Sequence, residues 1–155
     1  MSPSLGEQLK AREGFDTVEQ ELYLSILHTA DRLSAELASL LKGAQLTNAA
    51  YNVLRILRGA REDDGLPCSE ISARMLHRDS DITRLVDRLE KRGLVERRRQ
   101  EDDRRVVRVS VTTAGLELLS EFDAPVHELH LRQFGHVGKK RLAELARLLA
   151  SVRDR

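Results

Sequence analysis

The sequence has few of the features that stabilise a secreted or membrane-bound protein. It holds one cysteine, Cys68, which excludes an internal disulfide and fits the reducing conditions of the cytoplasm. No apolar run approaches the roughly 18 residues that a membrane span requires. Residues 1–13 are polar and lack the apolar segment of a signal peptide. We therefore expect a cytoplasmic protein that has no membrane partner.

Signals of catalysis are equally scarce. The sequence contains no glycine-rich phosphate loop and no recognisable pair of nucleophile and base. His127 and His130 stand close together, but no further clustered ligands accompany them, so a solvated or interfacial pair is favoured over a metal site. Cys68 opens a redox alternative, although a small residue packed at a helix start is the favoured interpretation. We expect no enzyme, no metal and no cofactor.

Length and charge narrow the class of protein further. With 155 residues, of which 41% are hydrophobic, the chain can bury the core of one domain with appended helices. The net charge of +1 does not by itself indicate a nucleic-acid partner. Residues 78–108, however, carry 11 Lys/Arg and 8 Asp/Glu. The placement of these arginines therefore matters more than the total charge.

Residues 69–111 change their periodicity in a way that predicts an element for reading DNA. Apolar residues recur on one face of a helix, at Ile82, Leu85, Val86 and Leu89. Gly93 then suits the left-handed position that ends a helix. Val107, Val109 and Val111 alternate with other residues, which is the spacing of a strand. A helix, a turn, a second helix and a hairpin in this order indicate a winged helix-turn-helix.

Amphipathic helices are predicted around this element as well. The first runs from an N-cap at Thr17 to about Lys42, where Gly43 ends it. The second helix is expected to start at Thr47. Later helices are expected to be capped by Ser69 and by Thr112 or Thr113, and the last helix covers residues 139–152.

The predicted fold class is mainly α with a small β-hairpin wing. It is a winged helix-turn-helix flanked by N- and C-terminal dimerisation helices. Residues 1–45 form an arm and the first dimerisation helix, residues 46–112 form the DNA-binding domain, and residues 113–155 form the C-terminal dimerisation helices.

This order of elements resembles the MarR family of bacterial transcriptional regulators. The resemblance rests on ITRLVDRLEKRGLVER at residues 82–97, on Asp103-Arg104-Arg105, and on VSVT at residues 109–112 leading to Gly115. It implies a homodimeric, sequence-specific DNA-binding regulator that acts as a ligand-responsive repressor on a pseudo-palindromic operator in double-stranded DNA. A winged-helix adaptor that binds only other proteins is the alternative, and the salt dependence of DNA binding distinguishes the two.

The predicted reading helix turns a polar face outward when its apolar face is buried. Arg84 can bridge the O6 and N7 atoms of guanine, whereas Arg78, near the positive end of the helix, suits a phosphate. Arg78 and His77 depart from the family pattern, so the helix cap is expected at Asp79 or Ser80. The predicted DNA contacts are Arg78, Ser80, Asp81, Thr83, Arg84, Arg88, Arg104 and Arg105. The alternative is a solvated helix with internal ion pairs.

In the hairpin, the resemblance implies that Asp103 supports the wing. Arg105 would then enter the minor groove, where narrow A·T tracts attract arginine, and Arg104 would contact a neighbouring phosphate. An ordinary charged turn is the alternative.

The terminal helices carry apolar residues that a small DNA-binding domain does not need. We expect Leu22, Ile26, Leu142, Leu145 and Leu149 to form a two-fold interface, which presents two reading helices to successive major grooves. Capping of a monomer's core is the alternative. The family resemblance also implies a small aromatic or anionic ligand in a cleft, for which His28, Arg32 and Tyr51 are candidates. Each of these three also has an ordinary explanation, as packing, surface charge or core aromatic.

Overall fold

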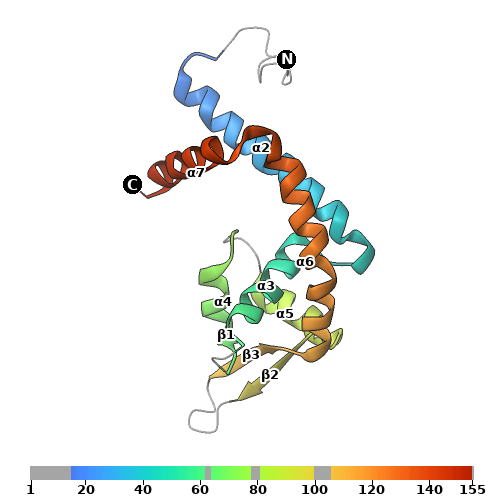
Figure 1. Cartoon of the computed structure of the whole chain (residues 1–155). Coiled ribbons are helices and arrows are strands. Elements are labelled where there is room, and N and C mark those ends of the chain that lie inside the picture. Colours follow the sequence, from blue (N-terminus) through green and yellow to red (C-terminus); the bar gives the residue numbers. More distant parts are fainter. Residues whose placement is uncertain (1–14, 62–63, 78–80, 100–105, 155) are drawn as a thin grey trace.

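Two long helices connect a packed lower half of the molecule with an open upper half (Figure 1). The structure is a computed structural model that describes residues 15–61, 64–77, 81–99 and 106–154. Helices α2 (Val18–Leu41) and α6 (Thr113–Phe134) pack against each other, and α7 (Lys139–Arg153) follows α6 after the 3₁₀ turn η2 (Gly135–Val137). The predicted fold class, mainly α with a small wing, is confirmed.

The first helix begins where the sequence predicts and ends differently. Thr17 caps α2 by accepting a hydrogen bond from the Gln20 amide at 3.2 Å. The α-helix stops at Leu41 and tightens into the 3₁₀ helix η1 (Lys42–Ala44). The left-handed residue that follows is Gln45, with φ of 53°, so the prediction that Gly43 ends the helix is wrong. The chain therefore turns two residues later than predicted.

Two of the predicted caps in the lower half of the molecule are also wrong. Helix α3 (Asn48–Gly59) begins directly after its N-cap Thr47, where the sequence places its start, but α4 (Cys68–Arg74) has Pro67 as its N-cap instead of Ser69. Pro67 is both the last residue of strand β1 (Leu66–Pro67) and the N-cap of α4. The helix therefore begins at Cys68, two residues earlier than a cap at Ser69 would place it. Helix α5 (Ile82–Lys91) is capped by Asp81 instead of Asp79 or Ser80.

A three-stranded antiparallel sheet lies below the helices, in the order β1-β3-β2. Strands β2 (Val95–Arg99) and β3 (Val107–Val111) form the predicted hairpin, and β1 adds a short third strand through the pairing of Leu66 with Val109. After β3 the hydroxyl of Thr112 caps α6. A side chain at Gly115 would collide with the carbonyl oxygen of Leu94, so glycine lets α6 start directly against the sheet.

The core is concentrated in the lower half of the molecule, which contains α3, α4, α5 and the sheet and is called the reading half below. Its members come from α3, α4, α5 and the sheet, and the start of α6 closes it with Leu119, which is fully buried. Arg58 on α3 also forms an ion pair with Asp123 on α6, at 2.9 Å. The ion pair thus adds to the apolar packing that holds α3 against α6.

The upper half exposes apolar side chains instead of burying them. No residue of α7 is buried, and Leu41 is the one buried residue of α2. The exposed large apolar residues of these two helices are Val18, Leu22, Tyr23, Leu27, Leu145, Leu148, Leu149 and Val152. In the described part of the chain, no helix has the combination of length and apolar character that a membrane crossing needs.

Candidate nucleic-acid interface

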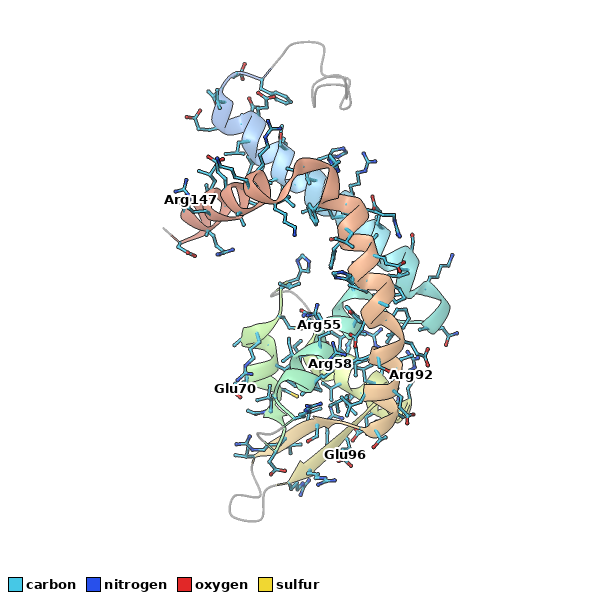
Figure 2. All side chains as sticks on the ribbon, in the orientation of Figure 1. Arg55, Arg58, Glu70, Arg92, Glu96 and Arg147 are labelled. Atoms are coloured by element: carbon cyan, nitrogen blue, oxygen red, sulfur yellow. The ribbon has the colours of Figure 1, made fainter. Side chains whose placement is uncertain are left out.

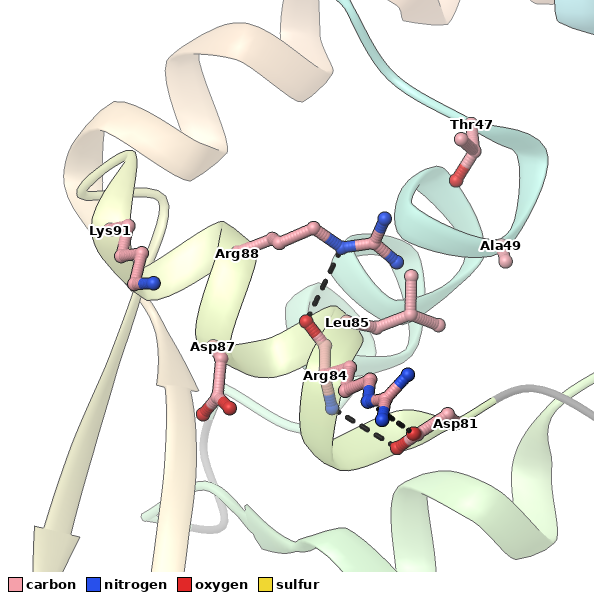
Figure 3. A pocket seen from close by; sticks show the side chains of 8 residues that line it. All are labelled: Thr47, Ala49, Asp81, Arg84, Leu85, Asp87, Arg88 and Lys91. Carbon is pink, nitrogen blue, oxygen red and sulfur yellow. Dashed lines mark hydrogen bonds and ion pairs between the residues drawn. The ribbon is translucent and has the colours of Figure 1, made fainter.

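Helix α5 separates its residues sharply into two faces. Ile82, Leu85, Val86 and Leu89 are buried in the core. Burying each of these side chains contributes about 2 kcal/mol, so the rotation of the helix is fixed by its apolar face. Thr83, Arg84, Arg88 and Lys91 are exposed as a result. The predicted outward face of the reading helix is thus the observed one (Figure 3).

The start of α5 is held by the cap residue. One oxygen of Asp81 accepts the Arg84 amide at 3.2 Å, and its other oxygen pairs with the Arg84 guanidinium at 3.2 Å. Arg88 in turn donates from Nε to the Arg84 carbonyl at 3.3 Å. Asp81 therefore has an intramolecular task, which is to orient Arg84 while leaving its side chain 84% exposed.

The exposed face of α5 borders a cleft of about 640 Å³ that also reaches the start of α3. Figure 3 shows Thr47 and Ala49 across the opening from Arg84 and Arg88. The N-terminus of a helix carries a partial positive charge, which adds to the charges of the arginines. The arginine side chains and the N-terminus of α3 both bring positive charge to this one opening. This arrangement favours the binding of an anion such as a DNA phosphate. Sequence reasoning missed this part of the site because it treated Thr47 as a cap alone.

An arginine joins the reading helix to the wing strand. The guanidinium of Arg97 lies 2.6 Å from Asp87 and 2.8 Å from Glu90, and the Arg97 amide also donates to Glu90 at 3.2 Å. Burial by itself would lower the pKa of Arg97, but the hydrogen bonds to the two carboxylates outweigh it and raise the pKa. The sequence signals only a run of three arginines, so the special role of Arg97 could not be predicted.

The predicted DNA contacts divide into two groups. Thr83, Arg84 and Arg88 lie together on the exposed face of α5, with Asp81 at its start. Arg78, Ser80, Asp103, Arg104 and Arg105 lie outside the described residues.

The predicted interface residues lie on the two terminal helices. Leu22, Leu145 and Leu149 are exposed, at 47%, 47% and 39%, while Ile26 and Leu142 are partly buried. Both helices thus present the predicted leucines on surfaces that this single chain does not cover.

The three candidate ligand residues are not brought together. His28 and Arg32 line a cavity of about 540 Å³ that α2, α6, η2 and α7 enclose, with Leu142 and Leu145 on its wall. Tyr51 lies elsewhere, 4% exposed, with its ring edge-on to Phe122 at 6.4 Å. Burial raises the pKa of the Tyr51 phenol.

The cavity beside His28 and Arg32 contains further polar groups that the sequence analysis missed. Arg132 and Gln133 join its lining from the end of α6, and His136 joins it from η2. Gln133 donates to Glu36 at 3.2 Å and to the Leu33 carbonyl at 3.4 Å, which ties α6 to α2. The cavity therefore offers two arginines and two histidines around an apolar wall, together with the carboxylate of Glu36, which lies 3.8 Å from the Arg32 guanidinium. This composition suits an organic anion.

The histidines and the cysteine that the sequence analysis considered lie outside any cluster of metal ligands in the described residues. Within the described ranges, no three His, Cys, Asp or Glu side chains gather in a way that could hold a metal ion. His130 instead shares a hydrogen bond with Gln133 at 3.1 Å. Cys68 is half-buried at the first position of α4 and forms no disulfide.

Comparison with known proteins gives concordant results. Residues 46–107 match the sequence model of the MarR family. The chain is 30% identical over 152 residues to the transcriptional repressor MprA of Escherichia coli (strain K12), which covers 95% of this chain and 86% of MprA. A MarR transcription factor from Planctomyces limnophilus is 42% identical and has a TM-score of 0.67, covering 88% of this chain and 98% of that one.

A third similar protein agrees in fold. It is BpsR of Bordetella bronchiseptica, whose DNA binding is regulated by 6-hydroxynicotinic acid. Its TM-score is 0.78 at 20% identity, over 92% of this chain and 99% of BpsR. At this identity the likeness concerns the fold alone.

Replacing Arg97 by alanine should lower the free energy of unfolding by about 1–2 kcal/mol, because partly buried charge-assisted hydrogen bonds are lost. Denaturant unfolding followed by circular dichroism measures this loss. Arg98 provides a matched control, since it pairs with Glu96 at 2.7 Å from a side chain that is 67% exposed. Arg98→Ala should cost less than about 0.5 kcal/mol. Equal losses would show that Arg97 forms only an ordinary surface pair.

Proposed function

The chain belongs to the MarR family of transcriptional regulators, and on that premise we propose that it is a homodimeric repressor that binds an operator in double-stranded DNA. The observation that carries the proposal is the exposed face of α5, where Arg84 and Arg88 share an opening with the positive end of α3. A surface of this kind attracts phosphates and also offers side chains to base edges. A repressor of this kind acts beside the chromosome, in the cytoplasm.

In the proposed complex, α5 enters the major groove. Arg84 then reaches a guanine with both of its terminal nitrogens, and Thr83 meets a neighbouring base edge. Arg88 and the start of α3 contact phosphates, which position the helix but carry no sequence information. Exposure of Arg84 and its orientation by Asp81 support this assignment.

The wing and the segment before α5 complete the proposed surface. Arg105 enters the minor groove, Arg104 contacts a phosphate, and Asp103 supports the loop. Arg78 and Ser80 add contacts near the start of the reading helix. These five residues adjoin elements that the structure does describe, namely the ends of β2 and β3 and the cap at Asp81. The roles of the wing residues are predictions from the family resemblance, and those of Arg78 and Ser80 are predictions from their side chains and their place near the start of the helix.

The exposed leucines of the terminal helices support the proposed dimer. Leu22, Leu145 and Leu149 are each well exposed in the single chain, and Ile26 and Leu142 lie on the same helices. Full burial of one such side chain contributes about 2 kcal/mol, so a two-fold interface counts every residue twice. A dimer of this kind presents two α5 helices to a pseudo-palindromic operator.

The cavity beside His28 and Arg32 supports a response to an aromatic or anionic ligand. Its volume of about 540 Å³ is large enough for a small organic acid, and the counter-charge comes from Arg132 and from Arg32, which a bound acid would share with Glu36. Leu142 and Leu145 connect the same cavity to the proposed interface. A ligand that prefers a different arrangement of these helices would change the separation of the reading helices. Tyr51 remains a second candidate, at a separate place.

The DNA contact of Arg84 is tested by its replacement. Arg84→Ala should weaken operator binding by about 1–3 kcal/mol, because a bidentate contact to guanine is lost. Fluorescence anisotropy with labelled operator duplexes, taken from the DNA that flanks the gene, measures this loss over a range of salt concentrations. Arg61→Ala, which removes an exposed arginine in the turn after α3, is the control and should bind as the wild type does. Wild-type binding that does not weaken with salt would contradict the proposed function.

The proposed dimer interface is tested by introducing a charged side chain into it. Leu145→Glu should convert the dimer into monomers and abolish operator binding, since a carboxylate without a partner cannot be buried in an apolar interface. Sedimentation velocity reports the oligomeric state. The matched control is Leu76→Glu, because Leu76 is 81% exposed and lies outside the terminal helices. A Leu145→Glu variant that stays dimeric and binds the operator would rule out this interface.

The ligand proposal makes a reciprocal prediction. Calorimetry with a salicylate-like acid should give a weaker affinity when operator DNA is present, by about 5- to 150-fold for a coupling of roughly 1–3 kcal/mol. Arg32→Ala should weaken binding of the acid and leave ligand-free DNA affinity nearly unchanged. Arg147→Ala, on α7 outside the cavity lining, is the control. Equal affinities with and without operator, or no binding at all, would contradict the proposal.

A further inference from the structure

Arg92 connects the end of the reading helix with the end of the first long helix. Its two terminal guanidinium nitrogens donate to two consecutive carbonyls, to Gln45 at 3.0 Å and to Ala44 at 2.8 Å. These carbonyls lie 47 and 48 positions away in the chain, at the corner between α2 and α3. Figure 2 labels Arg92 where the lower end of α6 meets the reading half.

The corner that Arg92 grips is well defined. The amides of Gln45 and Leu46 donate back to the carbonyls of Lys42 and Leu41, at 3.0 and 3.3 Å. The carbonyls of Ala44 and Gln45 lie beyond these bonds, at the negative end of the helix, where a cation is favoured. A guanidinium matches two neighbouring acceptors with its fork of donors, which a lysine ammonium cannot do. The position therefore favours a cation, and the geometry of its two acceptors favours arginine over lysine.

The other end of the Arg92 side chain is held just as firmly. Arg92 is the C-cap of α5, and Gly93 follows it in the left-handed conformation, with φ of 70°. The hydroxyl of Thr112, at the start of α6, donates to the Gly93 carbonyl at 2.6 Å. The Leu94 amide also donates to the Leu89 carbonyl at 3.0 Å. Arg92 thus links two rigid points, one on each side of the contact.

We propose that Arg92 is a positioning residue that sets the angle between α5 and α2 and so selects the half-site spacing that the dimer accepts. This inference rests on the proposed function, because it needs a dimer held by its terminal helices and two reading helices on one operator. Within each subunit, α2 belongs to the dimer layer and α5 reads the DNA. A direct link between their ends controls how far apart and at what angle the two α5 helices meet the duplex.

Half-site spacing is a demanding test of this angle. Adding one base pair between the half-sites moves one of them by about 3.4 Å and rotates it by about 35°, given 10–10.5 base pairs per turn. A dimer whose reading helices are fixed to α2 cannot follow this change without loss of contacts. A dimer without the Arg92 link accepts the altered spacing more easily, but its two reading helices are then less precisely positioned on the native spacing.

A phosphate contact by Arg92 would have a different signature. Arg92 is exposed and lies next to Lys91 on the basic side of α5. Loss of a phosphate contact weakens binding to all duplexes by a similar factor and reduces the salt slope by about one. Loss of a positioning contact changes the ratio of affinities between spacings instead.

The experiment compares duplexes that carry the same two half-sites at the native spacing, one base pair shorter and one base pair longer. Wild-type protein should prefer the native spacing by about tenfold or more, as for a mismatch within a site. Arg92→Ala should reduce this preference to about threefold or less, and Arg92→Lys, which keeps the charge but can serve one carbonyl, should lie between. Arg61→Ala is the control and should keep the wild-type ratio.

The outcomes separate the inference from the function beneath it. Wild-type protein that binds no operator, or binds all spacings equally, would overturn the proposed dimeric reading and this inference with it. A wild-type preference that Arg92→Ala retains in full, even with weaker binding overall, would overturn the inference alone and indicate a phosphate contact. Where circular dichroism shows that Arg92→Ala does not fold, the ratio for Arg92→Lys decides by the same criterion.

Discussion

The burial of one face of α5 is the constraint on which the rest of the structure depends. Four apolar side chains of this helix enter the core, and each contributes about 2 kcal/mol on burial. The repulsion between neighbouring arginines on the opposite face amounts to a few tenths of a kcal/mol per pair. Burial therefore outweighs repulsion by more than an order of magnitude. The protein can hold a concentrated positive surface outward because its core leaves that surface no other orientation.

Besides the apolar packing, a small set of arginines connects separate elements of the fold. Arg97 ties α5 to β2 through two carboxylates, Arg58 ties α3 to Asp123 on α6, and Arg92 ties the end of α5 to the corner after α2. Each contact joins elements that are distant in sequence. Apolar packing tolerates small rotations, whereas a charge-assisted hydrogen bond requires a particular direction. In this way the core supplies stability and the arginines supply geometry.

Local signals were predictable from the sequence, and contacts between distant segments were not. Thr17 and Thr112 cap helices as predicted, and α3 begins beside Thr47 as predicted, because a hydroxyl before an apolar period acts within one turn. The cap at Asp81 was misplaced because the run Asp79-Ser80-Asp81 offers three capping side chains in a row. Strand β1 was missed because two residues carry no periodicity, and only its pairing with β3 defines it.

For the candidate site, the helical period of α5 predicted that Thr83, Arg84 and Arg88 share one face. The position of Thr47 across the cleft was not predictable, because it depends on tertiary packing. The separation of Tyr51 from His28 and Arg32 depends on tertiary packing as well.

Helix α6 connects the sheet in the lower half of the molecule with the region where α7 begins. Its first turn is locked to the sheet, where Gly115 meets Leu94, and its last turn reaches the region where α7 begins. With 22 residues it is a lever arm about 33 Å long. A tilt of about 5° at the upper end displaces the lower end by about 3 Å, which is close to the rise of one base pair. A change of tilt at the α7 end would thus be enlarged along α6 to the scale of one base-pair step, and Pro125, which removes one hydrogen bond inside the helix, marks the place where α6 bends most easily.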